Sequence, residues 1–171
     1  MIVKHPFSSE PYHLKKMKYI HSKKIHYRMS VGKDRELIQQ LLTECNLPCP
    51  DIDLSKQYFI VAENDERMIG CCGFEICGEN GLFRSLAVSP DYRNLRIGRL
   101  LTDKIINFAP GKGICKFYLL TTTAGPFFTK QGWKETDRMN VPMEISRTTE
   151  FMTICPSTAI CMMYNLEPVK R

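Results

Sequence analysis

Three arginines stand close together between an apolar strand pattern and an amphipathic helix pattern. Arg93, Arg96 and Arg99 follow the stretch Leu86–Val88, and Gly98 lies among them. The N–H groups in the first turn of a helix lack intrahelical partners and carry the positive end of the helix dipole, so acidic side chains usually gather there. Arginines at that position favour an anion beside them, and phosphate binds helix N-termini without a metal. The alternative is a solvated basic turn.

A second candidate pair, Glu75 and Arg84, lies on two neighbouring strand patterns. Asn80-Gly81 predicts a two-residue hairpin turn between them. With that turn, positions 73, 75 and 77 share a face with positions 82, 84 and 86, which brings Glu75 within reach of Arg84. Glu75 would then draw a proton from an amine through water while Arg84 holds a carboxylate or another anionic oxygen. A structural cross-strand ion pair is the equal alternative.

Histidine and cysteine usage restricts the remaining chemistry. All four histidines lie in the first 26 residues, so a general base elsewhere must be a carboxylate, a tyrosine, a perturbed cysteine or a water. Triads that use histidine are excluded unless that segment folds back. The eight cysteines include no C-x-x-C pair and no secretory signal precedes them, which predicts reduced thiols that are mostly buried. No metal site is predicted.

The basic charge belongs to one end of the chain. Residues 1–24 hold six lysines against Glu10, and so contribute +5 of the formal net charge of +6. Such a segment is typical of a solubilising extension, although it could also touch nucleic acid or a membrane surface. We expect a flexible basic extension over residues 1–23 and one domain over residues 24–171. With no apolar run of about 20 residues, the expected location is the cytoplasm, with no membrane partner.

Hydrophobic periodicity and turn residues predict the elements that position these groups. Strands are expected at residues 25–30, 57–62, 68–77, 81–88, 116–121, from 133 onward and at 158–165. Helices are expected at residues 34–45, from the arginine loop to Pro110, at 125–131 and at 142–151. The inward positions expected on the first two helices are Leu37, Leu41, Leu42, Ile97, Leu100, Leu101, Ile105 and Phe108. Mixed strands and helices around a central hairpin predict an α/β (α+β) sandwich.

The arginine loop and one later segment resemble the GNAT superfamily of acyl-CoA-dependent N-acyltransferases. The family's loop reads Gln/Arg-x-x-Gly-x-Gly/Ala; Arg93 and Gly98 match its first and last positions, and Arg96 replaces its first glycine. The family's second signature, Ala-x-x-Phe-Tyr-x-x-x-Gly-Phe, is similar to Ala124–Trp133. This resemblance covers residues 24–165 and implies the GNAT fold, a central, mostly antiparallel mixed sheet flanked by helices. Four segments are similar to GNAT proteins associated with arsenic resistance: Leu82–Val88, Thr121–Ala124, Phe127-Phe128 and Cys155-Pro156. The stretch Arg84–Val88 is also similar to amino-acid N-acetyltransferases.

The resemblance implies roles for individual residues. Acetyl-CoA would be the co-substrate, with backbone amides near the end of the central strand polarising its thioester. The implied cofactor-binding residues are Leu86, Ala87, Val88, Arg93, Asn94, Arg96, Ile97, Gly98, Arg99, Phe127, Phe128 and Lys130. Phe128 stands where the family has its general-acid tyrosine, so the thiolate leaves unaided or takes its proton from another group. The candidate donors are Thr122, Thr123, Tyr118, Tyr164 and a water, and the sequence does not choose among them. The predicted hairpin, and not the resemblance, makes Glu75 a candidate catalytic residue and Arg84 a candidate substrate-binding residue. Ser85, next to Arg84, is a further candidate for binding the substrate.

These roles predict an acetyl-CoA-dependent N-acetyltransferase acting on the primary amine of a small molecule. Candidate acceptors are an amino acid or an arsenical amino-acid analogue, and thiols of Cys45, Cys49 and Cys155 are candidates for holding arsenic. One alternative is a module that binds acetyl-CoA with little catalysis, because Phe128 and Arg96 depart from the family pattern. Another is a protein lysine acetyltransferase directed by the basic extension. A nucleic-acid partner is not expected, and a homodimer is a candidate state.

Overall fold

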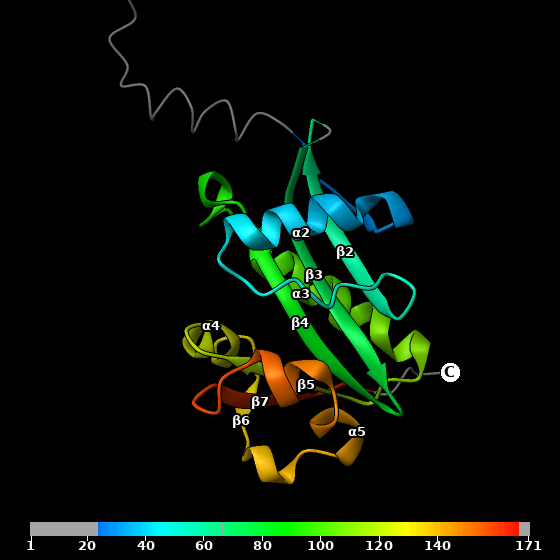
Figure 1. Ribbon diagram of the computed structural model, residues 1–171. Coiled ribbons are helices and arrows are strands. Elements are labelled where there is room, and N and C mark those ends of the chain that lie inside the picture. Colours follow the sequence, from blue (N-terminus) through cyan, green and yellow to red (C-terminus); the bar gives the residue numbers. More distant parts are fainter. Residues whose placement is uncertain (1–23, 66, 168–171) are drawn as a thin grey trace, which may run out of the picture.

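The computed structural model describes residues 24–65 and 67–167, and the predicted basic extension, residues 1–23, lies outside them. A seven-stranded sheet with the strand order β1-β2-β3-β4-β5-β7-β6 forms the centre (Figure 1). Its strands are β1 (His26–Met29), β2 (Gln57–Asn64), β3 (Arg67–Cys77), β4 (Asn80–Val88), β5 (Lys116–Thr121), β6 (Lys134–Glu135) and β7 (Ile160–Asn165). The neighbours pair antiparallel except β4 with β5, which run parallel. The predicted mixed, mostly antiparallel sheet is thus confirmed.

Two helices cover opposite faces of strands β2 to β4. α2 (Arg35–Glu44) packs with Phe59 and Val61, whereas α3 (Ile97–Phe108) packs with Ile60 and Ala62. Alternate residues of a strand point to opposite faces, so the two helices enclose the sheet between them (Figure 1).

The buried stripes of these helices differ slightly from those predicted. Ile38, Leu41 and Leu42 form the buried stripe of α2, and Leu37 is 43% exposed. In α3, Leu100 is likewise 43% exposed, while Ile97, Leu101 and Ile105 are buried. Each mistaken residue is the immediate neighbour of a buried one, about 100° around the helix from it, and the packing decides which of the two turns inward.

The C-terminal part carries shorter helices. α4 (Gly125–Thr129) follows β5, and α5 (Met143–Ser146) precedes a π-helical turn, η5 (Glu150–Ile154). The single helix predicted at 142–151 was therefore wrong, because the chain bends between the two pieces. Short 3-10 turns complete the structure at η1 (Gly32–Asp34), η2 (Pro90–Tyr92), η3 (Ala109–Lys112) and η4 (Arg138–Asn140).

The hairpin between β3 and β4 turns two residues earlier than predicted. Cys77 pairs with Asn80, so Gly78 and Glu79 form the turn, and Gly78 takes the left-handed conformation with φ +64°. Because the shift is an even number of residues, it preserves which side chains share a face. Gly73 lies opposite Arg84 and Glu75 opposite Leu82, so Glu75 and Arg84 are diagonal neighbours on one face, as predicted.

A β-bulge interrupts β4 just after Arg84. Ser85 has φ +57°, and the pairing register shifts so that Ala87 lies opposite Cys71. One extra residue reverses the alternation of side chains beyond it. The prediction that position 86 shares the face of Arg84 is therefore wrong, and Leu86 packs on the opposite face with the α3 core.

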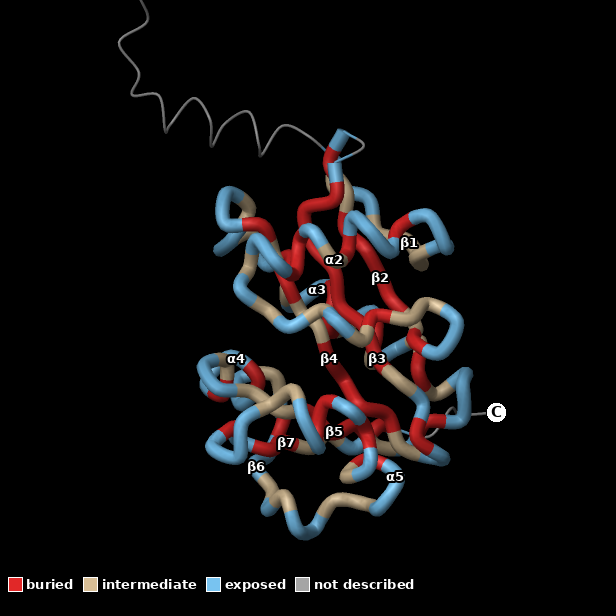
Figure 2. Tube along the Cα trace, viewed as in Figure 1, coloured by how far each residue is buried: buried red, intermediate tan, exposed pale blue. Residues whose placement is uncertain are grey.

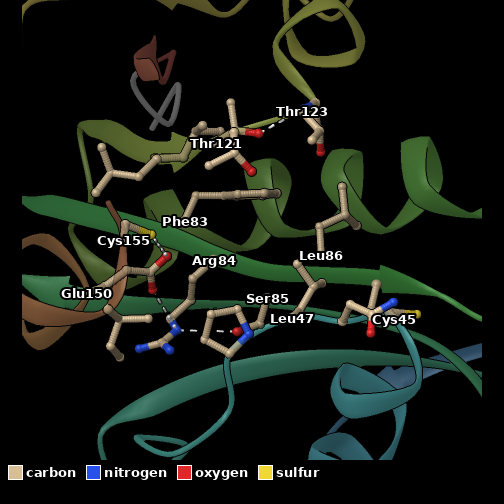
Figure 3. A pocket seen from close by; sticks show the side chains of 18 of the residues that line it. Cys45, Leu47, Phe83, Arg84, Ser85, Leu86, Thr121, Thr123, Glu150 and Cys155 are labelled. Atoms are coloured by element: carbon tan, nitrogen blue, oxygen red, sulfur yellow. Dashed lines mark hydrogen bonds and ion pairs between the residues drawn. The ribbon is translucent and has the colours of Figure 1, made fainter. Parts of the chain in front are cut away.

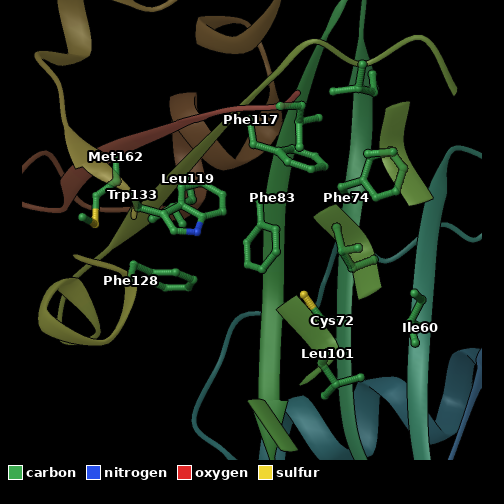
Figure 4. Packing of buried hydrophobic residues seen from close by; sticks show 14 of the residues in the cluster. Ile60, Cys72, Phe74, Phe83, Leu101, Phe117, Leu119, Phe128, Trp133 and Met162 are labelled. Carbon is green, nitrogen blue, oxygen red and sulfur yellow. The ribbon is translucent and has the colours of Figure 1, made fainter. Parts of the chain in front are cut away.

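The parallel ladder between β4 and β5 is short. Its register covers only Asn80–Leu82 against Lys116–Tyr118, and the two strands separate beyond this point. Aromatic rings pack where the strands are still close: Phe117 contacts Phe83 and Trp133, with ring centroids 5.9 and 6.3 Å away (Figure 4). Buried residues run along much of β2 and β3 and through Gly81–Arg84 of β4 (Figure 2). This core fixes the angle at which β4 and β5 diverge.

Candidate functional site

A cavity of about 630 Å³ opens where β4 and β5 separate (Figure 3). One wall is the second half of β4, Phe83–Val88, and the other is the end of β5 with the residues after it, Leu119–Ala124. Cys45–Pro48 and a C-terminal segment that includes Glu150 complete the lining. Its volume is within the usual range for small-molecule sites.

The predicted arginine loop lies at one end of this cavity. Arg93 lines it and donates a hydrogen bond from Nε to the Val88 carbonyl oxygen, 3.2 Å away. Helix α3 begins directly afterward at Ile97 and has no acidic residue in its first turn. The side chains of Arg93, Arg96 and Arg99 are exposed, and Arg99 Nε lies 3.8 Å from Asp103 Oδ2. A positive helix terminus and the guanidinium groups of Arg93 and Arg96 are thus available to an anion.

Two residues of this loop take a conformation that usually requires glycine. Asn94 has φ +66° and Arg96 has φ +61°. Arg96, which replaces the first glycine of the GNAT loop pattern, thus has a conformation that glycine adopts without strain. The left-handed conformation costs an L-residue about 1–2 kcal/mol. A strained backbone persists where the surrounding structure imposes it, and such positions cluster at ligand-binding sites.

At the other end, Arg84 is buried against three carboxylates. Its side chain is 2% exposed, and its Nη1 and Nη2 atoms donate to Asp51 Oδ2 and Oδ1 at 2.5 and 2.6 Å. Arg84 Nη1 lies 3.8 Å from Glu75 Oε2, and Nε lies 3.2 Å from Glu150 Oε2. One arginine thus faces three carboxylates, a surplus of two negative charges when all are ionised. Burial disfavours the charged guanidinium, but its hydrogen bonds to Asp51 and the charges of Glu150, Asp51 and Glu75 raise the pKa of Arg84.

Glu150 is the carboxylate of this cluster that lines the cavity. The residue is 9% exposed, and its Oε2 accepts no hydrogen bond from the described residues, because Arg84 Nε donates to Ser85 Oγ instead, 3.3 Å away. Its Oε1 accepts from the Cys155 thiol at 3.7 Å. Burial raises the pKa of Glu150, with Asp51 and Glu75 adding to the rise and Arg84 opposing it. Burial, and then Glu150, raise the pKa of Cys155 to about 11.

The second predicted signature also reaches the cavity. Phe128 lines it and packs in the core against Phe83 and Trp133, with ring centroids 5.6 and 5.4 Å away. Phe127 is half-exposed and faces Gly98, where an added Cβ would lie 3.6 Å from the Phe127 ring. On the cavity wall formed by the end of β5 and the residues after it, the hydroxyl groups belong to Thr121, Thr122 and Thr123.

Eight of the predicted site residues line the cavity: Arg84, Ser85, Leu86, Ala87, Val88, Arg93, Thr122 and Phe128. The other eight lie outside its lining: Glu75, Asn94, Arg96, Ile97, Gly98, Arg99, Phe127 and Lys130. Ile97 is buried in the core, and Lys130 is exposed at the end of α4. Sequence reasoning missed Asp51 and Glu150, because isolated acids in a loop and in a misassigned helix carry no periodic signal.

The three cysteines considered for arsenic are not all at the cavity. Cys45 and Cys155 contribute to its lining, and Cys49 does not. Within residues 24–65 and 67–167, no three His, Cys, Asp or Glu side chains are placed to hold a metal ion. The same residues contain no helix that is long and apolar enough to cross a membrane.

Comparisons with known proteins agree with this architecture. A family profile described as "Acetyltransferase (GNAT) domain" matches residues 55–135. An uncharacterized N-acetyltransferase of Chlorobaculum tepidum is 35% identical over 104 residues, which cover 60% of this chain and 64% of that protein. The amino-acid acetyltransferase of Shewanella oneidensis is 32% identical over 84 residues, 48% of this chain and 19% of that protein. The chain therefore spans less than two thirds of the length of these relatives.

Solved structures share the fold. N-acetylglutamate synthase from Neisseria gonorrhoeae, in complex with coenzyme A and N-acetyl-glutamate, superposes with a TM-score of 0.71 at 21% identity, over 84% of this chain and 35% of that one. A GNAT-family acetyltransferase from Staphylococcus aureus gives a TM-score of 0.67 at 21% identity, over 84% of this chain and all of that one. The chain has the fold of these GNAT acetyltransferases, and its residues 55–135 match the profile of the GNAT acetyltransferase domain. Acetyl-CoA is the co-substrate of this family.

Proposed function

We propose that this protein is an acetyl-CoA-dependent N-acetyltransferase that acetylates the primary amine of a small molecule. The observation that carries this proposal is one continuous cavity between the separating strands β4 and β5. It extends from Arg93, beside the N-terminus of α3, to the buried carboxylate of Glu150. Transfer of an acetyl group from a nucleotide thioester to an amine requires a site that binds the anionic nucleotide and a group that accepts a proton from the amine. The two ends of this cavity offer these two features.

The residues at the arginine end fit the diphosphate of a coenzyme A thioester. Exposed arginines and a helix N-terminus without an acidic residue favour phosphate oxygens. Gly98 leaves the backbone of the first helical turn uncovered, with Phe127 and Val88 as its nearest neighbours. When bound there, acetyl-CoA supplies an acetyl group activated as a thioester.

The remaining cavity residues position the reacting groups. Beyond Leu82, β4 has no ladder partner in β5, so backbone N–H groups between Leu86 and Val88 are candidates to polarise a thioester carbonyl. Arg84 and Ser85 border the acceptor end, and Thr122 offers a hydroxyl to the departing thiolate. Glu75 does not line the cavity, and it contacts the acceptor end through Arg84. Any effect of Glu75 on proton transfer is therefore exerted through Arg84.

A module that binds acetyl-CoA with little catalysis is the second candidate, and Phe128 is the observation that favours it. The ring lines the cavity at the position of the family's general-acid tyrosine but brings no hydroxyl. A thiol with a pKa near ~8.5 leaves tolerably as its anion, so the absence of this donor slows turnover rather than abolishing it.

The test is acetyl-CoA-dependent release of free thiol across amino acids, arsenical amino-acid analogues, alkylamines, polyamines and peptides. We expect turnover with at least one small amine, together with a thermal shift on acetyl-CoA. A thermal shift without turnover on any amine would assign the protein to the binding class. A strong preference for lysine peptides over every small amine would favour the protein acetyltransferase alternative.

A further inference from the structure

The charge balance around Arg84 carries an inference about the acceptor, which rests on the proposed function. A single arginine beside a cavity is usually available to a substrate carboxylate. Here both terminal nitrogens of Arg84 already bind Asp51 in a bidentate pair at 2.5 and 2.6 Å, and its Nε donates to Ser85 Oγ. A carboxylate-bearing acceptor would therefore have to displace Asp51 from a side chain that is 2% exposed.

Glu150 is oriented differently from the other two acids of the cluster. Asp51 and Glu75 do not line the cavity, and Glu150 does. Its Oε2 lies 3.2 Å from Arg84 Nε without an aligned hydrogen bond, so one lone pair of a buried carboxylate oxygen lacks a donor among the described residues. A buried carboxylate oxygen in that state favours a donor from the cavity side.

We infer that Glu150 receives the ammonium group of the acceptor and that the cluster selects cationic amines which carry no carboxylate. An ammonium group supplies the donor that Glu150 Oε2 lacks and offsets the surplus negative charge. Asp51 has a positioning role, because it occupies the arginine that would otherwise attract an anionic acceptor.

The proton balance of the transfer follows from this placement. The ammonium nitrogen gives one proton to the Glu150 carboxylate and becomes a free amine. Its lone pair then forms the C–N bond to the acetyl carbon as the thioester C–S bond breaks, and the electron pair of that bond leaves with the sulfur. The second proton of the nitrogen passes to the thiolate, and Glu150 releases its proton to solvent.

Three variants separate the role of Glu150 from that of other acids. With Glu150→Gln, kcat/KM at neutral pH should fall by about 10² or more, the usual contribution of a general base. The deficit should shrink as pH rises toward the pKa of the amine, because the amine then arrives already deprotonated. Glu144→Gln, the same change on an exposed acid of α5, should stay within about twofold of wild type. The assignment of Glu150 as the proton acceptor would be overturned by two results together. One is a larger loss of kcat/KM in Glu75→Gln than in Glu150→Gln, and the other is a pH profile of Glu150→Gln that equals the wild-type profile.

The acceptor class is tested with alkylamines, diamines and ω-amino acids of equal chain length, whose amine groups have similar pKa values. We expect wild type to prefer the alkylamine and the diamine over the amino acid by at least about tenfold in kcat/KM. Asp51→Asn should reduce that preference by about tenfold by freeing Arg84, and its thermal unfolding shows whether it is folded. Equal or better use of the amino acid by wild type would overturn the inference. Absence of turnover with all of these amines would instead contradict the proposed function itself.

The pH dependence of wild type gives a further readout. Arg84, Asp51, Glu75 and Cys155 are the charged and titratable groups that face Glu150, and burial together with the two acids raises the pKa of Glu150. Activity should therefore rise with pH, and the midpoint of this limb of the pH profile should lie above the pH range in which an ordinary glutamate titrates. That limb should be absent in Glu150→Gln; its persistence there would assign it to another group.

Discussion

Arg96 shows how a single residue keeps a loop shape that its side chain disfavours. Its φ of +61° places it in the left-handed region, directly before the first residue of α3. The guanidinium contributes charge beside the helix terminus, while the backbone pays a conformational cost of about 1–2 kcal/mol. Replacing Arg96 by glycine therefore changes the charge and the backbone strain together, with opposite expected effects on coenzyme A binding and on stability.

Arg96→Gly should raise the free energy of unfolding by about 1 kcal/mol, because glycine adopts positive φ without a steric penalty. The same variant should bind coenzyme A more weakly, since one guanidinium is lost. Denaturant unfolding and calorimetry measure the two effects. Arg99→Gly is the control: it removes the same charge one turn into the helix, and there glycine should reduce stability by about 1 kcal/mol. Destabilisation by Arg96→Gly would contradict the account of the loop.

Arg84 is the residue on which the charge balance of the cleft depends. Arg84→Met would leave Asp51, Glu75 and Glu150 facing one another without a cation, and breaking a buried ion pair typically costs about 3–5 kcal/mol. Denaturant unfolding near neutral pH should show a loss of that size. The loss should shrink at acidic pH as the carboxylates become protonated. A change below about 1 kcal/mol would mean that the pair is screened by solvent.

At the scale of elements, the divergence of β4 and β5 depends on a close contact at its narrow end. A Cβ added to Gly81 would lie 2.4 Å from Phe117 Cε1, and Phe117 is held by the rings of Phe74, Phe83 and Trp133. Gly81 thus lets the strands approach at their paired end, before they separate around the cavity.

Gly81→Ala should destabilise the protein by about 1–3 kcal/mol, because the ring of Phe117 cannot move aside in a packed core. Gly98→Ala is the matched control, since its Cβ would meet nothing closer than 3.6 Å and alanine favours helix α3. Thermal unfolding of both variants measures the difference. Equal stabilities would mean that the contact at Gly81 relaxes freely.

Local patterns predicted most of these elements, whereas their long-range relations came from the structure. The alternation along β2 to β4 and the α3 stripe are encoded in neighbouring residues, so their existence and type were predictable. The bulge at Ser85 was not, because no residue type marks it, and it moves Leu86 to the opposite face. The pairing of Glu75 with Arg84 was predicted because an even shift of the turn leaves the parity unchanged.

The candidate site likewise has one part that local patterns predicted and another part that only the structure revealed. The arginine loop was recognisable because three cations at a helix start are unusual. Asp51 and Glu150 come from segments 33 residues before and 66 residues after Arg84, and only the tertiary fold brings them to it. Asp51, which accepts the hydrogen bonds from both terminal nitrogens of Arg84, is therefore not indicated by any local sequence pattern.

For the whole molecule, the sheet, α3 and the C-terminal segment act together to form one cleft with two kinds of charge. Positive groups lie at the start of α3, and the Arg84 cluster has a surplus of carboxylates. Opposite charges at the two ends fit a phosphate-bearing donor and a cationic acceptor that meet between β4 and β5.

The most direct measurement is calorimetric titration of the protein with coenzyme A, repeated with Gly98→Ala. We predict saturable one-to-one binding in wild type and binding at least about tenfold weaker in Gly98→Ala, whose fold should be unchanged. No heat of binding in wild type at millimolar coenzyme A would contradict the account at its centre.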